Sequence, residues 1–174
     1  MRGLGRMKLA DALAEWGAHE AAGRWQRSKN GDLGDRQYYA EAVEMALITR
    51  SPLVWRLLAA WPAETLRVEI SAEDIPGLIL ADARSVSEWT EAVISDDSDS
   101  GSHIRRMADS IEQVRGPLLC SAQKTPAGQL AAPIVIFDGW HRVAAWALQI
   151  KRRAPYPLSA NLLVTRHAVR LLGR

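Results

Sequence analysis

The sequence contains a single cysteine, Cys120, so no disulfide can form within the chain. One thiol is typical of proteins from a reducing compartment and predicts a cytoplasmic location. No segment approaches the roughly 18 uninterrupted apolar residues of a membrane-spanning helix, so we expect no membrane insertion. The basic residues 1–8 are followed by acidic residues where a secretory signal would be purely apolar, which argues against a signal peptide.

Of the 174 residues, 48% are apolar and 24% are charged, which favours a packed core over disorder. The charges are unevenly distributed. Residues 64–100 contain two Lys or Arg against ten Asp or Glu, whereas residues 101–174 contain eleven against three. Two solvated faces that partly neutralise each other would explain this pattern. A basic C-terminal segment that attracts a polyanion, such as a nucleotide or DNA, would explain it equally well.

Residues 1–63 predict a helical extension. Its first helix should end in the turn-forming segment 28–35, and a second helical stretch over about 36–61 should break at Ser51-Pro52, because proline disrupts a helix interior. Helical spacing favours burial of the aromatic residues over a platform that stacks bases. These residues are Trp16, Trp25, Tyr38, Tyr39, Trp55 and Trp61.

Residues 64–174 predict a second domain, which gives the chain an α+β fold. Alternating or short apolar segments indicate strands, and longer segments with one apolar face indicate helices. Strands are expected at 66–70, 79–80, 118–120, 133–137 and 158–164. Helices are expected at 86–94, 104–114 and 141–150, followed by a basic tail helix with His167, Arg170 and Arg174.

A Ser- and Asp-rich segment, residues 95–102, separates two of these helices. Its composition predicts a solvated loop. Alternating Asp and Ser also suggests a calcium-binding loop, but the distal Glu that an EF-hand requires is missing.

The segment from Phe137 to Arg142 is the strongest candidate for a functional site. A buried apolar strand ends in Asp138-Gly139, and a helix begins directly after it. The first amides of a helix lack intrahelical partners and its dipole favours negative charge, so such a turn attracts phosphate. Glycine permits the tight turn that brings the backbone close to a ligand.

Three side chains of this turn have the chemistry of phosphate recognition. The Arg142 guanidinium can hold phosphate oxygens, and His141 can donate a proton or a hydrogen bond near neutral pH. The Asp138 carboxylate can accept a proton or hold a metal ion that bridges phosphates. The structural alternative is that Asp138 caps the helix and forms a surface ion pair with Arg142.

The order of elements resembles the ParB/sulfiredoxin superfamily: a helix, a Gly-Pro turn, a short strand, a loop, an apolar strand, Asp-Gly-Trp-His-Arg and a helix. The similarity begins near residues 67–70, passes through 107–111 and 116–118, and ends near Val164. It covers about a hundred residues and excludes the helical extension.

The resemblance implies a compact mixed-sheet domain that binds a nucleoside triphosphate, with ATP and Mg²⁺ as cofactors. Asp138, His141 and Arg142 would be catalytic, with Asp138 also the metal ligand. The remaining nucleotide-binding positions would come from the turn and from the helix before Gly116-Pro117. These positions are Gly139, Trp140, Arg106, Ser110 and His103.

The sequence departs from several family members at Trp140. Sulfiredoxins carry their catalytic cysteine at this position, and chromosome-partitioning ParB proteins carry glutamate, so neither sulfinic-acid repair nor a CTP-dependent clamp is expected. The free-serine kinases, with Asp-Gly-Thr-His-Arg, have the nearest motif. Two roles for Trp140 remain open, which are docking of the helical extension and stacking on a base or ribose.

A small domain of this superfamily with a helical N-terminus also resembles the plasmid-encoded fertility-inhibition proteins. That resemblance implies ATP hydrolysis, DNA cleavage and interference with a type IV secretion component. The first hypothesis is therefore an ATPase and DNase. The alternative is a non-enzymatic module that binds nucleotide or DNA, or blocks a secretion partner.

Overall fold

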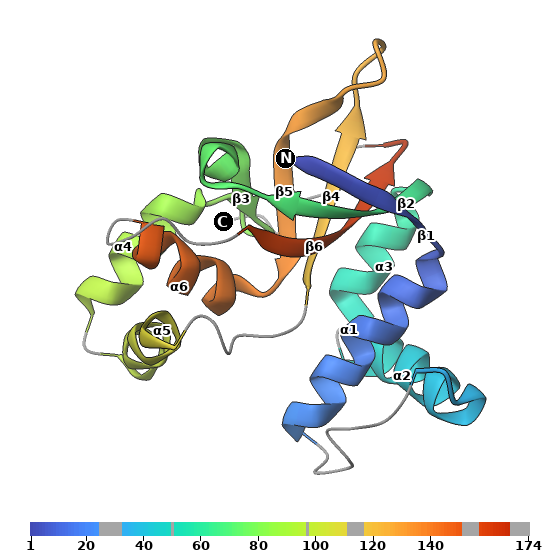
Figure 1. The fold of residues 1–174 in the computed structure, drawn as a ribbon, viewed down its shortest axis with the longest axis horizontal. Coiled ribbons are helices and arrows are strands. Elements are labelled where there is room, and N and C mark those ends of the chain that lie inside the picture. The colour runs from blue at the N-terminus through green and yellow to red at the C-terminus, as the bar shows by residue number, and fades with distance from the viewer. Residues whose placement is uncertain (25–32, 50, 97, 111–116, 151–156, 168–174) are drawn as a thin grey trace.

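A computed structural model describes residues 1–24, 33–49, 51–96, 98–110, 117–150 and 157–167, and Figure 1 shows their arrangement. A six-stranded mixed sheet forms the centre. Its strands are β1 (Arg2–Met7), β2 (Pro62–Ile70), β3 (Leu78–Leu80), β4 (Leu118–Lys124), β5 (Leu130–Asp138) and β6 (Leu158–Thr165). Their spatial order is β1-β2-β6-β4-β5-β3. The β4–β6 and β3–β5 pairs are parallel, and the other three pairs are antiparallel.

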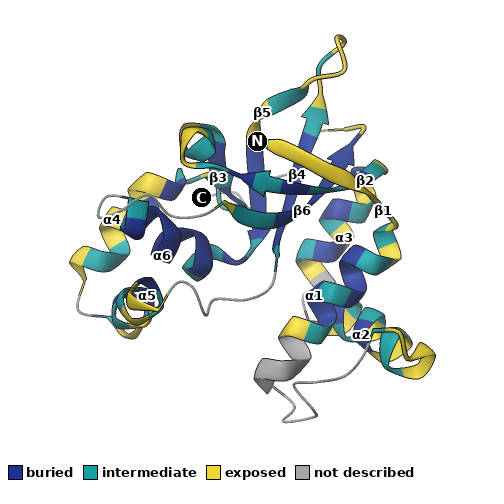
Figure 2. Cartoon of the chain, viewed as in Figure 1, coloured by how far each residue is buried: buried dark blue, intermediate teal, exposed yellow. Residues whose placement is uncertain are grey.

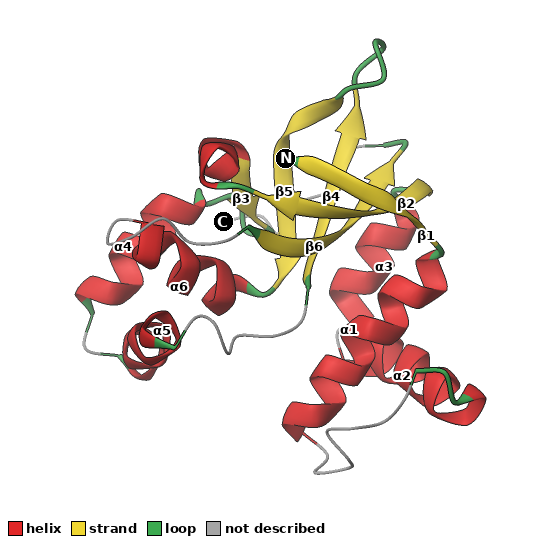
Figure 3. Cartoon of the chain, in the orientation of Figure 1, coloured by secondary structure: helices red, strands yellow, loops and turns green. Residues whose placement is uncertain are grey.

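Helices lie on both sides of this sheet (Figure 3). The N-terminal group consists of α1 (Leu9–Arg24), α2 (Arg36–Thr49) and α3 (Ser51–Ala59). The other group consists of α4 (Val86–Ser95), α5 (Asp99–Asp109) and α6 (Trp140–Ile150), and a short 3₁₀ helix, η1 (Ala72–Gly77), connects β2 to β3. No helix within the described ranges is both long enough and apolar enough to cross a membrane.

The central strands supply apolar side chains to both faces, because successive residues of a strand point in opposite directions. In β5, Ile134 and Ile136 pack with α4, α5 and α6, whereas Val135 and Phe137 pack with α1 and α3. The central strands and the inner faces of the helices are accordingly buried (Figure 2). Two hydrophobic cores therefore flank the sheet, and the turn from β5 to α6 is anchored in both.

The expected α+β fold is confirmed, and each strand expected in the second domain is present. The break at Ser51-Pro52 is also confirmed, because α2 ends at Thr49 and α3 begins at Ser51. Most of the predicted turn at 28–35 and of the basic tail helix lies outside the described residues. The exposed His167 is described, and its amide donates to the Ala60 carbonyl at 3.2 Å.

The expectation that residues 1–63 are wholly helical apart from turns is wrong at the N-terminus, where β1 forms an edge of the sheet. This strand pairs antiparallel with β2, and Arg2 lies opposite Glu69 in an ion pair. Five of its six residues are exposed and two of them are glycines, so the strand has no buried apolar face and produces no alternating pattern. The division of the chain at residue 63 stays a prediction.

The expectation of a solvated loop at 95–102 is wrong for its second half, because α5 already begins at Asp99. Ser98 caps this helix, and its Oγ accepts a hydrogen bond from the Gly101 amide at 3.2 Å. Ser, Asp and Gly are weak helix formers but favourable at and near a helix N-terminus, and the composition of the segment concealed this role. The helix ends at Asp109, and residues 111–114 of the predicted helix are outside the described part.

Burial of the aromatic residues is confirmed only in part. Trp16 is 3% exposed, but Trp55 and Trp61 are 60% and 66% exposed, so the prediction is wrong for these two. In α3 the inward positions belong to Val54 and Leu57, which leaves Trp55 on the outer face. Tyr38 and Tyr39 are partly buried, and Trp25 lies outside the described residues.

Candidate functional site

The turn between β5 and α6 has the predicted strand-to-helix geometry. β5 ends at Asp138, and Gly139 takes a φ of 91°, which side chains disfavour. A Cβ on Gly139 would also lie 2.4 Å from Leu118 Cδ2 and 3.0 Å from Arg142 Nη2. The Gly139 carbonyl accepts the first helical hydrogen bond, from the Val143 amide at 2.9 Å. Glycine is therefore required both by the backbone angle and by the close packing beneath the turn.

Arg142 lies beneath this turn, and its side chain is buried. Its Nη2 is 3.1 Å from Asp138 Oδ2, and its Nη1 donates to the Pro117 carbonyl at 3.0 Å. The Asp138–Arg142 ion pair expected under the structural alternative therefore forms. It is not a surface contact, because Arg142 is only 6% exposed. The guanidinium thereby joins the start of β4, the end of β5 and the first turn of α6.

This placement bears on the expected roles of Arg142 and Asp138. An arginine that grips phosphate presents its donors to the ligand, whereas these donors already contact a carboxylate and a carbonyl of the chain. Direct phosphate contact would require the guanidinium to leave at least one of these partners. The catalytic roles of both residues stay predictions.

Trp140 turns its indole inward. Its Nε1 donates to the Ile136 carbonyl at 3.1 Å, and its ring meets that of Trp89 edge-on, with centroids 5.9 Å apart. The side chain contacts both hydrophobic cores, including the one that contains Leu13 and Trp16 of α1. These contacts favour the docking role over stacking on a ligand, because the indole N–H and one ring edge already have partners within the chain.

His141 belongs to a cluster of rings at the start of α6. Its ring centroid is 5.5 Å from that of His103 on α5 and 5.7 Å from that of Trp89 on α4. Burial and then the neighbouring His103 lower the pKa of His141, while Asp138 acts in the opposite direction. His141 is therefore neutral near pH 7 and can accept a proton.

The resemblance implies three nucleotide-binding residues in and directly after α5, and of these His103 contacts the turn, through the ring of His141. Arg106 and Ser110 are exposed near the C-terminal end of α5. Their recorded hydrogen bond joins them to each other, from Ser110 Oγ to the Arg106 carbonyl at 3.0 Å. Both remain candidate nucleotide-binding residues without a contact that connects them to the turn.

Two partners at the site have no clear signal in the sequence. Trp89 was assigned only to a helix, and its contact with Trp140 and His141 depends on how α4 packs against α6. The carbonyl of Pro117 accepts from Arg142, a role that no side-chain pattern reveals. The Gly-Pro dipeptide marked a turn at this point, but it did not indicate what the carbonyl would bind.

Cys120 lies on β4, near the buried ion pair. Complete burial raises the pKa of its thiol to about 12, with opposing contributions from Arg142 and Asp138. Because the thiolate is the reactive form, the thiol is unreactive in the folded chain.

The residues at the turn do not by themselves form a metal centre. Among the described residues there is no group of three or more His, Cys, Asp or Glu side chains that could hold a metal ion. The Asp138 side chain is only 14% exposed and is paired with Arg142. Magnesium, however, commonly binds one carboxylate together with substrate phosphates, so it could arrive with a nucleotide.

Searches of protein-family profiles, curated proteins and solved structures find no match for this chain.

Proposed function

We propose that the chain binds a nucleoside triphosphate at the turn between β5 and α6. The observation that carries the proposal is the conformation of Gly139, whose φ of 91° directs the chain from a buried strand straight into a helix N-terminus. The first amides of α6, from Trp140 and His141, occupy the positions that bind anions in helix N-terminal sites. Neutral His141 and the exposed His103 lie beside them, together with the Asp138 carboxylate that is paired with Arg142.

The resemblance to the ParB/sulfiredoxin superfamily supports ATP, delivered with Mg²⁺, as the nucleotide. The helix α5 that precedes residues 116–118 contacts the start of α6 through His103, as expected of a second wall. The buried Asp138–Arg142 pair would hold the turn in shape rather than contact the phosphates.

Hydrolysis is the reaction that we propose for the bound triphosphate. A water oxygen would attack the γ-phosphorus, the bond to the β-phosphate oxygen would break, and ADP would leave. His141 is the group suited to accept the proton of the water, because it is neutral and half-buried at the helix start. The amides of the turn would stabilise the charge on the transferred phosphoryl group.

The test is ATP turnover with Mg²⁺ by the unmodified chain and by His141→Gln, with His167→Gln as the matched control. His167 is an exposed histidine on another part of the surface. We expect His141→Gln to lower turnover roughly 10²-fold or more, as for the loss of a general base, and His167→Gln to leave it unchanged. If the unmodified chain, both histidine variants and Asp138→Ala all hydrolyse ATP at the same rate, the activity comes from a contaminant.

The burial of Arg142 favours a second candidate, a non-enzymatic module that binds nucleotide or DNA. With its guanidinium bound to Asp138 and Pro117, Arg142 is not placed to stabilise a phosphoryl-transfer transition state, as an exposed arginine often does. The basic block of residues 101–174 would then bind DNA through its phosphates. A salt titration tests this mode, because several phosphate contacts should cost orders of magnitude in affinity between about 50 and 200 mM salt.

The finer assignments depend on these measurements. DNA cleavage, a role in plasmid transfer and the blocking of a type IV secretion component rest on the family resemblance alone, and a cytoplasmic location rests on the single cysteine. Incubation of supercoiled plasmid with the chain and Mg²⁺ tests the nuclease proposal, with His141→Gln as the comparison. Plasmid that remains supercoiled under conditions of measurable ATP turnover would refute the nuclease assignment.

A further inference from the structure

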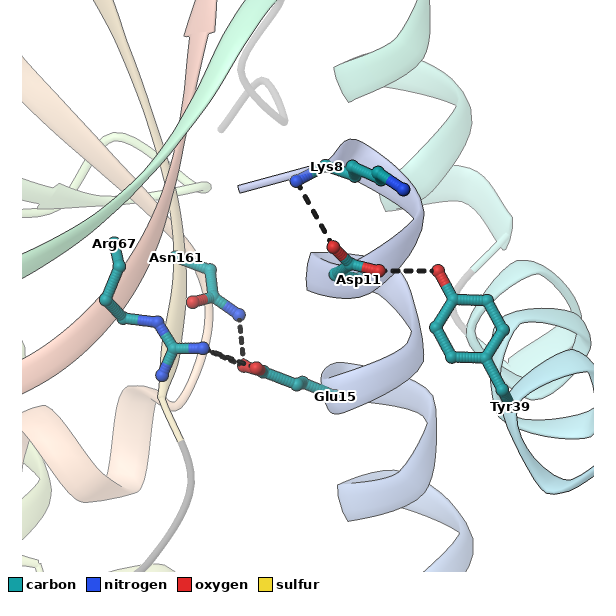
Figure 4. A network of polar contacts seen from close by, with 6 residues as sticks. All are labelled: Lys8, Asp11, Glu15, Tyr39, Arg67 and Asn161. Atoms are coloured by element: carbon teal, nitrogen blue, oxygen red, sulfur yellow. Dashed lines mark hydrogen bonds and ion pairs between the residues drawn. The ribbon is translucent and has the colours of Figure 1, made fainter. Parts of the chain in front are cut away.

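A second site lies on the opposite face of the sheet from α6, between α1, α2 and the strands β1 and β2. It is a pocket of about 490 Å³, a volume within the range typical of small-molecule sites. Its lining residues are Met7, Asp11, Glu15, Leu33, Tyr39 and Arg67. Figure 4 shows the polar side chains of this region, which extend from the sheet, α1 and α2.

The two acidic residues of the pocket differ in their partners. Glu15 is paired with Arg67 and also accepts from Asn161 Nδ2 at 2.9 Å, so a cation of the chain compensates its charge. Asp11 accepts from the Tyr39 hydroxyl at 2.8 Å and from the Lys8 amide at 3.4 Å. Both of these donors are neutral, and within the described residues no ion pair of Asp11 with a cation is recorded.

The described side chains of the pocket therefore do not balance in formal charge. They include two carboxylates and one guanidinium, which leaves one formal negative charge at Asp11. Burial and then the hydrogen bond to Asp11 raise the pKa of Tyr39, so this phenol stays neutral at physiological pH and adds no second charge. Asp11 and Glu15 are one helical turn apart on α1. Figure 4 shows the Glu15 side chain directed to Arg67 and Asn161 of the sheet, whereas the Asp11 carboxylate is directed to Tyr39 of α2.

We propose that this pocket binds a small organic monocation, an alkylammonium or alkylguanidinium, with Asp11 as its counterion. A charged nitrogen would donate to the Asp11 carboxylate in a charge-assisted hydrogen bond. The alkyl part would lie against Met7 and Leu33, and the ring of Tyr39 can contact the cation through its face. The site is independent of the turn at Gly139, so either proposal can fail without the other.

The test is an NMR titration of the ¹⁵N-labelled full chain with butylguanidinium and with butylurea, which has nearly the same shape but no charge. We expect butylguanidinium to produce saturable shifts of amide signals from residues 7–15 and 33–39. Butylurea should bind at least about tenfold more weakly, which corresponds to about 1.4 kcal/mol. This comparison uses the unmodified chain and depends on no variant.

Asp11→Asn and Glu44→Gln provide the matched pair of variants. Asn at position 11 keeps an acceptor for the Tyr39 hydroxyl but removes the charge, whereas Glu44 is an exposed acid of α2 that does not line the pocket. We expect Asp11→Asn to weaken butylguanidinium binding at least about tenfold and Glu44→Gln to leave it unchanged. Any one of three results would overturn the proposal: equal affinity for the two probes, equal losses in the two variants, or no saturable shift with butylguanidinium. The polar groups would then serve only to dock the helices on the sheet.

Discussion

Replacement of Arg142 by methionine should destabilise the chain far more than loss of an ordinary surface ion pair. The change removes the charge but keeps an unbranched side chain of similar length. It removes the guanidinium that pairs with the Asp138 carboxylate, which is 14% exposed, and that donates to the Pro117 carbonyl. Breaking a buried pair from one side costs about 3–5 kcal/mol. Because Asp138 retains some contact with solvent, we expect the lower part of this range, about 3 kcal/mol.

The assay is urea unfolding at pH 7, with Arg84→Met as the control. Arg84 forms a comparable pair with Asp82, but their side chains are 40% and 25% exposed, and such pairs contribute about 0–1 kcal/mol. For a chain of this length a loss of 3 kcal/mol should also lower the melting temperature by roughly 6–12 °C. Equal losses in the two variants would refute the conclusion that the Asp138–Arg142 pair is buried and structural.

Three further predictions concern the turn and its neighbours. Because the pKa of His141 is lowered in the folded chain, this histidine takes up a proton at higher pH in the unfolded chain, and stability should fall as the pH drops below about 6.5. Urea unfolding from pH 8 to 5 should show a smaller decrease in the free energy of unfolding for His141→Gln than for His167→Gln. Gly139→Ala should cost about 1–3 kcal/mol in backbone strain, with additional crowding. Gly128→Ala, with a φ of 79° but open space around it, should cost less in the same assay. Trp140→Ala should cost roughly 3–5 kcal/mol, because its ring contacts both cores; an unchanged melting temperature with weaker nucleotide binding would instead indicate stacking on the ligand.

The features of the site that depend only on residues close in the sequence could be predicted. The apolar segment before Asp138, the glycine at 139 and the helical spacing after it together specify a strand, a turn and a helix. Each of these signals depends on neighbouring residues, and each is present in the structure. The same holds for β2 and β6, whose patterns of apolar residues predicted strands over most of their lengths.

The partners of the site could not be predicted, because they come from segments distant in the chain. The Pro117 carbonyl is 25 residues from Arg142, and the ring contacts of His141 depend on the packing of α4 and α5 against α6. The edge strand β1 escaped prediction for a related reason. Backbone pairing with β2 holds it in place, while its exposed side chains have no buried face that would mark it in the sequence.

If a phosphate binds at this turn as proposed, the two environments available to Arg142 determine its contacts. If the guanidinium moved to a ligand, it would gain a charge-assisted hydrogen bond worth about 1.5–3 kcal/mol. Asp138 would lose its pairing with Arg142 in a largely buried position, and breaking a buried pair costs about 3–5 kcal/mol. The exchange is unfavourable unless the ligand also compensates Asp138, as Mg²⁺ bound to a triphosphate could. Phosphate without a metal ion should therefore bind through the amides and His141 with the ion pair intact, whereas Mg²⁺ is what would allow Arg142 to reach the nucleotide.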